Sequence, residues 1–95
     1  MLNGKQKRFL RSLAVNEKAL FQIGKEGLTD QLIVSLKQAL AKREMLKISI
    51  LKSCEIPKNE LIIDILATTG SELVQSIGRN LVIYKRSRNK VIELP

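Results

Sequence analysis

The sequence predicts a single compact α/β domain in which a four-stranded mixed sheet packs with helices. A chain of 95 residues can bury one modest core, and a hydrophobic fraction of 44% is typical of a globular protein. Amphipathic helical patterns alternate with short strand-like runs in the order α-β-α-β-α-β-β. The strand-helix-strand connections favour parallel neighbours, whereas a terminal hairpin must be antiparallel. We therefore treat residues 1–95 as one domain.

The first half of the chain contains two predicted helices and two predicted strands. Asn3 is a good N-cap for a helix over residues 3–15, and the apolar run at residues 19–23 reads as a strand. Thr29 is predicted to cap a second helix that reaches about Arg43. Residues 46–50 then alternate with the period of a strand that buries one face.

The second half adds a third helix and a hairpin. Pro57 suits the first turn of the helix, and Gly70 suits its C-terminal end. Strands are predicted over residues 72–77 and 81–86, joined by a three-residue loop at 78–80. Residues 87–95 are expected to form a loose tail or a short edge strand.

A glycine-rich turn at residues 24–29 leads from the first strand into the second helix. Gly24 and Gly27 would let the backbone come close to a ligand, and Lys25 adds a mobile cation. A helix N-terminus, here capped by Thr29, carries partial positive charge. Two interpretations stay open on these residues alone: a loop that cradles a nucleic-acid backbone, or a strand-to-helix turn that needs its glycines.

The charge balance points to a polyanionic partner. Seventeen Lys and Arg against nine Asp and Glu give a net charge of +8, which suits either nucleic acid or an anionic membrane. Aromatic residues make up only 3%, so contacts to phosphates are favoured over stacking on bases. The cations of the first helix are either a solvated face or a face that contacts a polyanion, and a helix lying on a membrane is less favoured. These cations are Lys5, Lys7, Arg8 and Arg11.

Catalytic and metal-binding patterns are lacking in the sequence. Without histidine, the usual proton shuttle, catalytic triads and zinc sites are excluded, and the carboxylates are too scattered to suggest an acid/base pair. Lys25 is followed by Glu26 and Gly27, so the turn is not a nucleotide-hydrolysing P-loop. We expect a non-enzyme without cofactor or metal. No apolar run is long enough for a membrane span, and no secretion signal is present, so we expect a cytoplasmic protein.

Several segments in their order and spacing resemble one known family, the CRM domain, as found in small bacterial YhbY-like ribosome-associated proteins. The matching segments are I-G-K-E-G-L-T at 23–29, A-L at 39–40, R-E-M-L-K-I at 43–48, T-G at 69–70, L-V-Q at 73–75, I-G-R-N at 77–80 and V-I-Y-K-R at 82–86. They cover nearly the whole chain. Met45 in place of the usual leucine and the intervening Lys85 are small departures.

The resemblance implies a stand-alone RNA-binding domain similar in fold to the C-terminal domain of translation initiation factor three. It also implies association with rRNA in precursors of the large ribosomal subunit, as an assembly factor. The family's RNA-binding loop falls on Gly24, Lys25, Glu26 and Gly27, with Thr29 at its end, and Glu26 must point away from a bound phosphate. Further cations proposed to neutralise phosphates are Lys5, Lys7, Arg8, Arg11, Arg79, Lys85, Arg86 and Arg88.

Two further alternatives concern Tyr84 and the function as a whole. Tyr84 is either a base-stacking residue or, as we prefer, a strand aromatic packed against the core. The alternative function is a module that docks on ribosomal or other proteins, with RNA contact incidental. In either case we expect a monomer.

Overall fold

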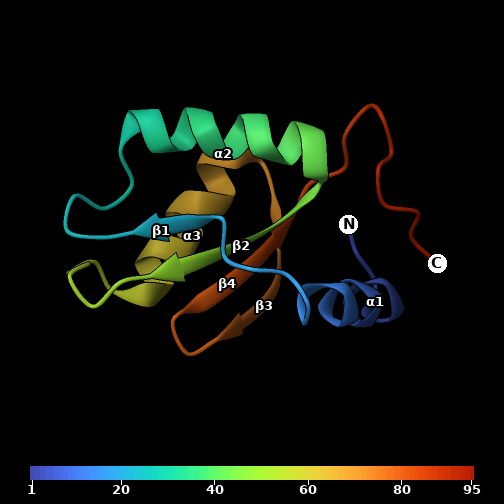
Figure 1. The fold of residues 1–95 in the computed structure, drawn as a ribbon, viewed down its shortest axis with the longest axis horizontal. Helices are drawn as coiled ribbons and strands as arrows, with labels where there is room; N and C mark the ends of the chain where they lie inside the picture. Colours follow the sequence, from blue (N-terminus) through green and yellow to red (C-terminus); the bar gives the residue numbers. More distant parts are fainter.

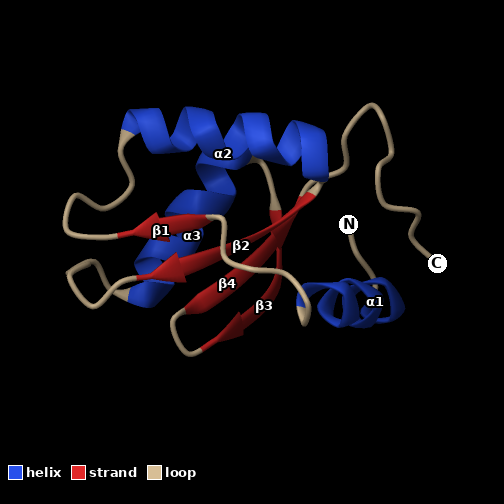
Figure 2. Cartoon of the chain, viewed as in Figure 1, coloured by secondary structure: helices blue, strands red, loops and turns tan.

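The computed structural model describes residues 1–95 and contains three helices and four strands in the predicted order (Figure 1, Figure 2). The helices are α1 (Gly4–Ala14), α2 (Asp30–Arg43) and α3 (Lys58–Thr69), and the strands are β1 (Phe21–Ile23), β2 (Met45–Ile50), β3 (Glu72–Ile77) and β4 (Asn80–Tyr84). The α/β class and the mixed four-stranded sheet are confirmed.

The strands lie in the order β1-β2-β4-β3, with β1 parallel to β2 and the other two pairs antiparallel. The β1-α2-β2 unit therefore has the expected parallel neighbours. β2 and β3 also run in the same direction, but β4 is inserted between them. The expectation of parallel neighbours is thus wrong for the unit that contains α3, because the terminal hairpin folds back into the sheet.

One face of the sheet is covered by α2 and α3. Alternate residues of the strands point to this face, and they pack against Leu36 and Leu40 of α2 and Leu61 and Ile65 of α3. All four of these helix side chains are buried. Burial of this apolar surface is the main force that holds the two helices on the sheet. The strand residues of this cluster are Ile23, Leu46, Ile48, Ile50, Leu81 and Ile83.

The opposite face is covered in part by α1. Leu10 and Ala14 of α1 pack with Val74, Val82 and Tyr84, and the C-terminal segment adds further apolar contacts. β4 thus supplies Leu81 and Ile83 to the cluster under α2 and α3, and Val82 and Tyr84 to the cluster under α1, because successive side chains of a strand point to opposite faces. Because β4 is buried on both sides, it links the two clusters.

Local capping signals explain where the helices begin and end. Asn3 and Gln6 form a reciprocal capping box at α1. The Thr29 hydroxyl accepts a hydrogen bond from the Leu32 N–H at 3.1 Å. Gly70 ends α3 in the left-handed conformation, with φ 68°.

The hairpin and the chain after it differ from the sequence prediction. The connecting loop has two residues, Gly78 and Arg79, because Asn80 pairs with Ile77. A φ of 56° at Gly78 suits such a tight turn between antiparallel strands. β4 ends at Tyr84, and no strand follows it, so the edge-strand alternative for residues 87–95 is wrong.

Candidate nucleic-acid interface

Three loops meet at one end of the sheet, which we call the loop end: residues 24–29, 51–57 and 78–79 (Figure 1). They meet there because β1 and β2 are parallel and end together, while β4 begins beside them. Two backbone hydrogen bonds join the loops at 51–57 and 78–79 to the ends of the neighbouring strands. The Leu51 N–H donates to the Ile23 carbonyl at 2.8 Å, and the Ile50 N–H donates to the Arg79 carbonyl at 2.7 Å.

The glycine turn is closed by a hydrogen bond from the Gly27 N–H to the Gly24 carbonyl at 3.0 Å. Gly27 has φ 67°, and a Cβ added there would lie 2.6 Å from Cδ1 of Ile56. A Cβ at Gly24 would lie 3.2 Å from the Ser53 hydroxyl oxygen. Gly27 is therefore required by its backbone conformation and by its packing on the 51–57 loop, whereas a Cβ at Gly24 would need only a small shift of the Ser53 side chain.

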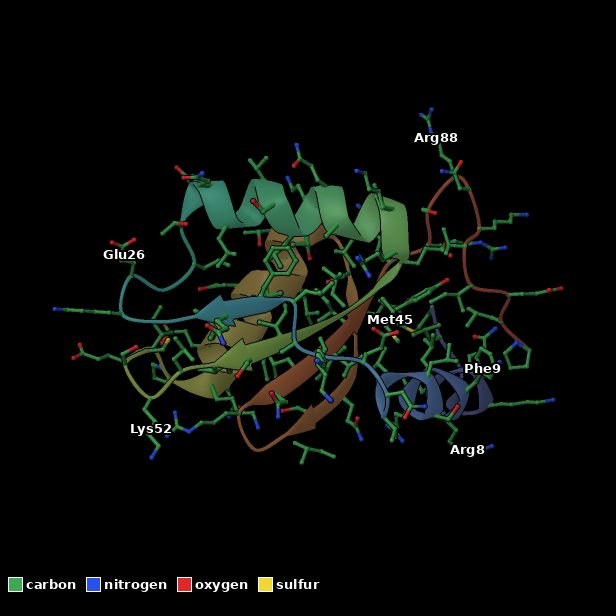
Figure 3. The ribbon with its side chains drawn as sticks, viewed as in Figure 1. Arg8, Phe9, Glu26, Met45, Lys52 and Arg88 are labelled. Atoms are coloured by element: carbon green, nitrogen blue, oxygen red, sulfur yellow. The ribbon has the colours of Figure 1, made fainter.

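The outer side of the turn borders a shallow hollow beside β1 and the start of α2. Lys25 and Glu26 are exposed there, and Gly24, Gly27 and Thr29 also line the hollow. The Glu26 side chain points outward into solvent (Figure 3). Where the turn carries no side chain, its backbone is accessible, and an anion can come close to it.

The loop end carries cations from all three loops, and the loops at 24–29 and 51–57 also carry acids, whereas the loop with Arg79 has none. The cations are Lys25, Lys52, Lys58 and Arg79, and the carboxylates of the same loops and the helical turns that follow are Glu26, Asp30, Glu55 and Glu60. Sequence reasoning missed Lys52 as a site residue. The available signal was topological, because loops that follow parallel neighbouring strands lie at the same edge.

The cations of α1 lie at the other end of the molecule. Arg8 and Glu26 are at opposite ends in Figure 3. Arg11 is used in the fold, since its Nε donates to the Val74 carbonyl at 3.1 Å and so fixes α1 to β3. Lys5, Lys7 and Arg8 have no such bond to the protein, and Lys5 and Arg8 are exposed.

Lys85, Arg86 and Arg88 also lie away from the glycine turn. Lys85 donates from Nζ to the Thr69 carbonyl at 3.1 Å and so satisfies the C-terminal end of α3. Arg86 and Arg88 are exposed beside α2.

The predicted site residues thus fall into two groups. The loop end has Gly24, Lys25, Glu26, Gly27, Thr29 and Arg79, and the far end has Lys5, Lys7, Arg8, Arg11, Lys85, Arg86 and Arg88.

Glu44 is a buried carboxylate that sequence reasoning did not single out. It ends α2 with φ 66° and accepts hydrogen bonds from the Ser87 N–H at 2.7 Å and the Ile92 N–H at 2.5 Å. Burial alone would raise the pKa of Glu44, but these backbone hydrogen bonds outweigh it and lower the pKa below the ordinary 4.5. Glu44 therefore anchors the C-terminal segment to the junction of α2 and β2.

Tyr84 belongs to the core. Its side chain is 3% exposed and packs in the cluster beneath α1. Burial raises the pKa of Tyr84 above its usual 10.0, and the nearby Glu44 carboxylate adds to this. The base-stacking alternative is therefore wrong, and the core interpretation is confirmed.

Other kinds of site have little support in this structure. No group of three or more His, Cys, Asp or Glu side chains is placed to hold a metal ion. Cys54 packs against the core cluster of α2 and α3 from the 51–57 loop. None of the helices has the length and apolar character needed to cross a bilayer.

The family resemblance is tested by comparison with known proteins. The sequence pattern of the CRS1 / YhbY (CRM) domain matches residues 2–85. The chain belongs to this family. The CRM chain is 48% identical over its full length to the whole of a Bacillus subtilis protein named as a probable RNA-binding protein, YqeI. It is 33% identical to an RNA-binding protein of Haemophilus influenzae, with 99% of this chain and 95% of that protein covered.

The fold of the CRM chain is also that of a solved structure. The solution structure of SAV1595 from Staphylococcus aureus, a hypothetical protein described as a candidate for RNA binding, superposes with a TM-score of 0.81. The two chains share 48% identity, and each is covered completely. The α/β fold expected from the family is therefore confirmed.

Proposed function

We propose that the protein binds structured rRNA during maturation of the large ribosomal subunit and that the loop end contacts the RNA backbone. Membership of the CRM family and the RNA-binding relatives support RNA as the ligand. The observation that carries the choice of site is the meeting of the glycine turn with two other loops that bear Lys52 and Arg79. The protein acts as a binding factor and as a monomer in the cytoplasm.

The proposed contact combines backbone and side chains. The Gly24–Gly27 turn presents main chain to a phosphate, because neither glycine has a side chain to hold the ligand away. Lys25, Lys52 and Arg79 neutralise neighbouring phosphates. The Glu26 side chain borders the same hollow but points outward into solvent (Figure 3), so its charge opposes a phosphate less than a carboxylate directed at the turn would.

The loop end is tested with the double variant Lys25→Gln/Lys52→Gln. Binding to transcribed large-subunit rRNA domains is measured by fluorescence anisotropy at several salt concentrations. Loss of two phosphate contacts should lower the slope of log K against log salt by about two units. The control Lys18→Gln/Lys42→Gln removes the same charge from a hollow that borders α1 and α2. Equal slopes for the two variants would contradict the proposed site.

The role in subunit maturation is tested by sedimentation. The protein should co-sediment with precursor large subunits more than with mature ones, and nuclease treatment of the particles should release it. Retention on nuclease-treated particles would indicate docking on ribosomal proteins in place of RNA.

A further inference from the structure

A second hollow lies between α2 and the C-terminal segment. It has a volume of about 460 Å³ and is lined by four cations, Lys37, Lys85, Arg86 and Arg88, and by no carboxylate. The loop end, by contrast, has as many carboxylates as cations when its loops and the first turns of α2 and α3 are taken together. This second hollow is therefore the concave surface with the most positive charge that no carboxylate opposes.

Glu44 fixes the backbone that carries Lys85, Arg86 and Arg88. Arg86 and Arg88 flank Ser87, and the Ser87 N–H is fixed by the buried Glu44 carboxylate. The Lys85 N–H also donates to the Glu44 carbonyl at 2.8 Å. Binding groups on an anchored backbone lose less conformational entropy when a ligand arrives. The Glu44 carboxylate accepts hydrogen bonds from two backbone N–H groups, and Glu44 is not among the residues that line the hollow.

Stabilisation of helix ends does not account for all of these cations. Lys85 donates to the end of α3. The C-terminal end of α2 offers only about half of one negative charge. Lys37, Arg86 and Arg88 remain exposed, and together they exceed that partial charge several-fold. Guanidinium groups are suited to phosphate because two parallel N–H groups can bind two of its oxygens.

We propose that this hollow is a second phosphate-binding site, so that the protein holds two separate segments of RNA backbone at once. The identity of the ligand as RNA rests on the proposed function, whereas the site rests on the hollow itself. Arg88 and Glu26 lie at opposite ends of a molecule 37 Å long (Figure 3). The two sites thus contact RNA segments that are apart in the RNA structure, and the protein clamps them together.

The clamp is tested with two RNA hairpins too short to reach both sites. Stems of about six base pairs span about 20 Å at roughly 3.4 Å per step. One hairpin is immobilised, protein is added, and capture of a second, labelled hairpin is measured. The wild type should capture it, and Arg86→Gln/Arg88→Gln should reduce capture at least about tenfold while still binding the immobilised hairpin.

The control Lys18→Gln/Lys42→Gln removes equal charge, and Lys42 lies on α2 but borders a different hollow. If it reduces capture as strongly, or if the wild type captures nothing, the clamp is refuted, while the salt slopes of Lys25→Gln/Lys52→Gln still decide the loop end. Loss of capture in the arginine variant with no effect of the loop variant would support the hollow as a phosphate site but refute a clamp between it and the loop end. Anionic vesicles that compete equally at the same phosphate concentration would overturn RNA as the ligand.

Discussion

At the scale of single residues, Glu44 combines two features that are each unfavourable alone. It is fully buried, and it has a positive φ, which is uncommon for a residue with a side chain. Two backbone hydrogen bonds to its carboxylate compensate, and both come from the C-terminal segment. The ionised side chain therefore stabilises the position of a segment far from it in the sequence.

The ionisation of Glu44 makes stability depend on pH. Because its pKa is lower in the folded state than the ordinary 4.5, its contribution is complete above about 4.5 and is lost as the pH falls through the folded-state value. Glu44→Gln should lower the free energy of unfolding at neutral pH by about 1–3 kcal/mol, since a donor amide then faces backbone donors. It should also flatten the fall in stability on acidification.

Urea unfolding at neutral pH and at several acidic pH values measures both effects. Glu55→Gln is the matched control, because Glu55 is exposed. The same acid sensitivity in wild type and Glu44→Gln would show that Glu44 does not cause it.

At the scale of elements, local signals in the sequence were sufficient for the helix ends and for β3, and insufficient for the limits of β1 and β4. The caps at Asn3, Thr29 and Gly70 predicted three helix ends correctly, because capping depends on neighbouring residues. β1 starts at Phe21, two residues later than predicted, and the hairpin loop is one residue shorter. Strand limits depend on pairing with distant residues, which no local pattern contains.

Leu10 is the largest fully buried side chain by which α1 packs on the sheet. Leu10 of α1 is fully buried, whereas Leu13, one turn later in the same helix, is 37% exposed. Leu10→Ala should lower the free energy of unfolding by about 2–5 kcal/mol, because it leaves a cavity, and Leu13→Ala should lower it much less. Urea denaturation of the two variants measures the difference, and equal losses would mean that α1 does not pack on the sheet through Leu10.

At the scale of the whole molecule, the candidate site could be predicted only in part. The glycine turn followed from its spacing and from the family resemblance. The separation of Lys25 from Arg86 and Arg88 did not, because it depends on the order of the strands and on where the C-terminal segment is anchored. The insertion of β4 between β2 and β3 is likewise a property of the assembled sheet.

The two core clusters should unfold together because β4 supplies side chains to both. Tyr84 is the only tyrosine, and the chain has no tryptophan, so its fluorescence reports the cluster beneath α1. Far-UV circular dichroism reports all three helices, of which α2 and α3 pack on the other cluster. Both signals should give the same urea midpoint, as a two-state domain requires. A tyrosine transition at lower urea than the helical one would show that the clusters separate.

The order in which the strands are synthesised also differs from their order in space. β4 is the last strand to be made, yet it lies between β2 and β3. While the chain grows at about 5–20 residues per second, β2 has β1 on one side and no partner on the other until residues 80–84 emerge. The complete sheet therefore cannot form before residues 80–84 are available, because β2 and β3 pair only with β4 on their facing edges.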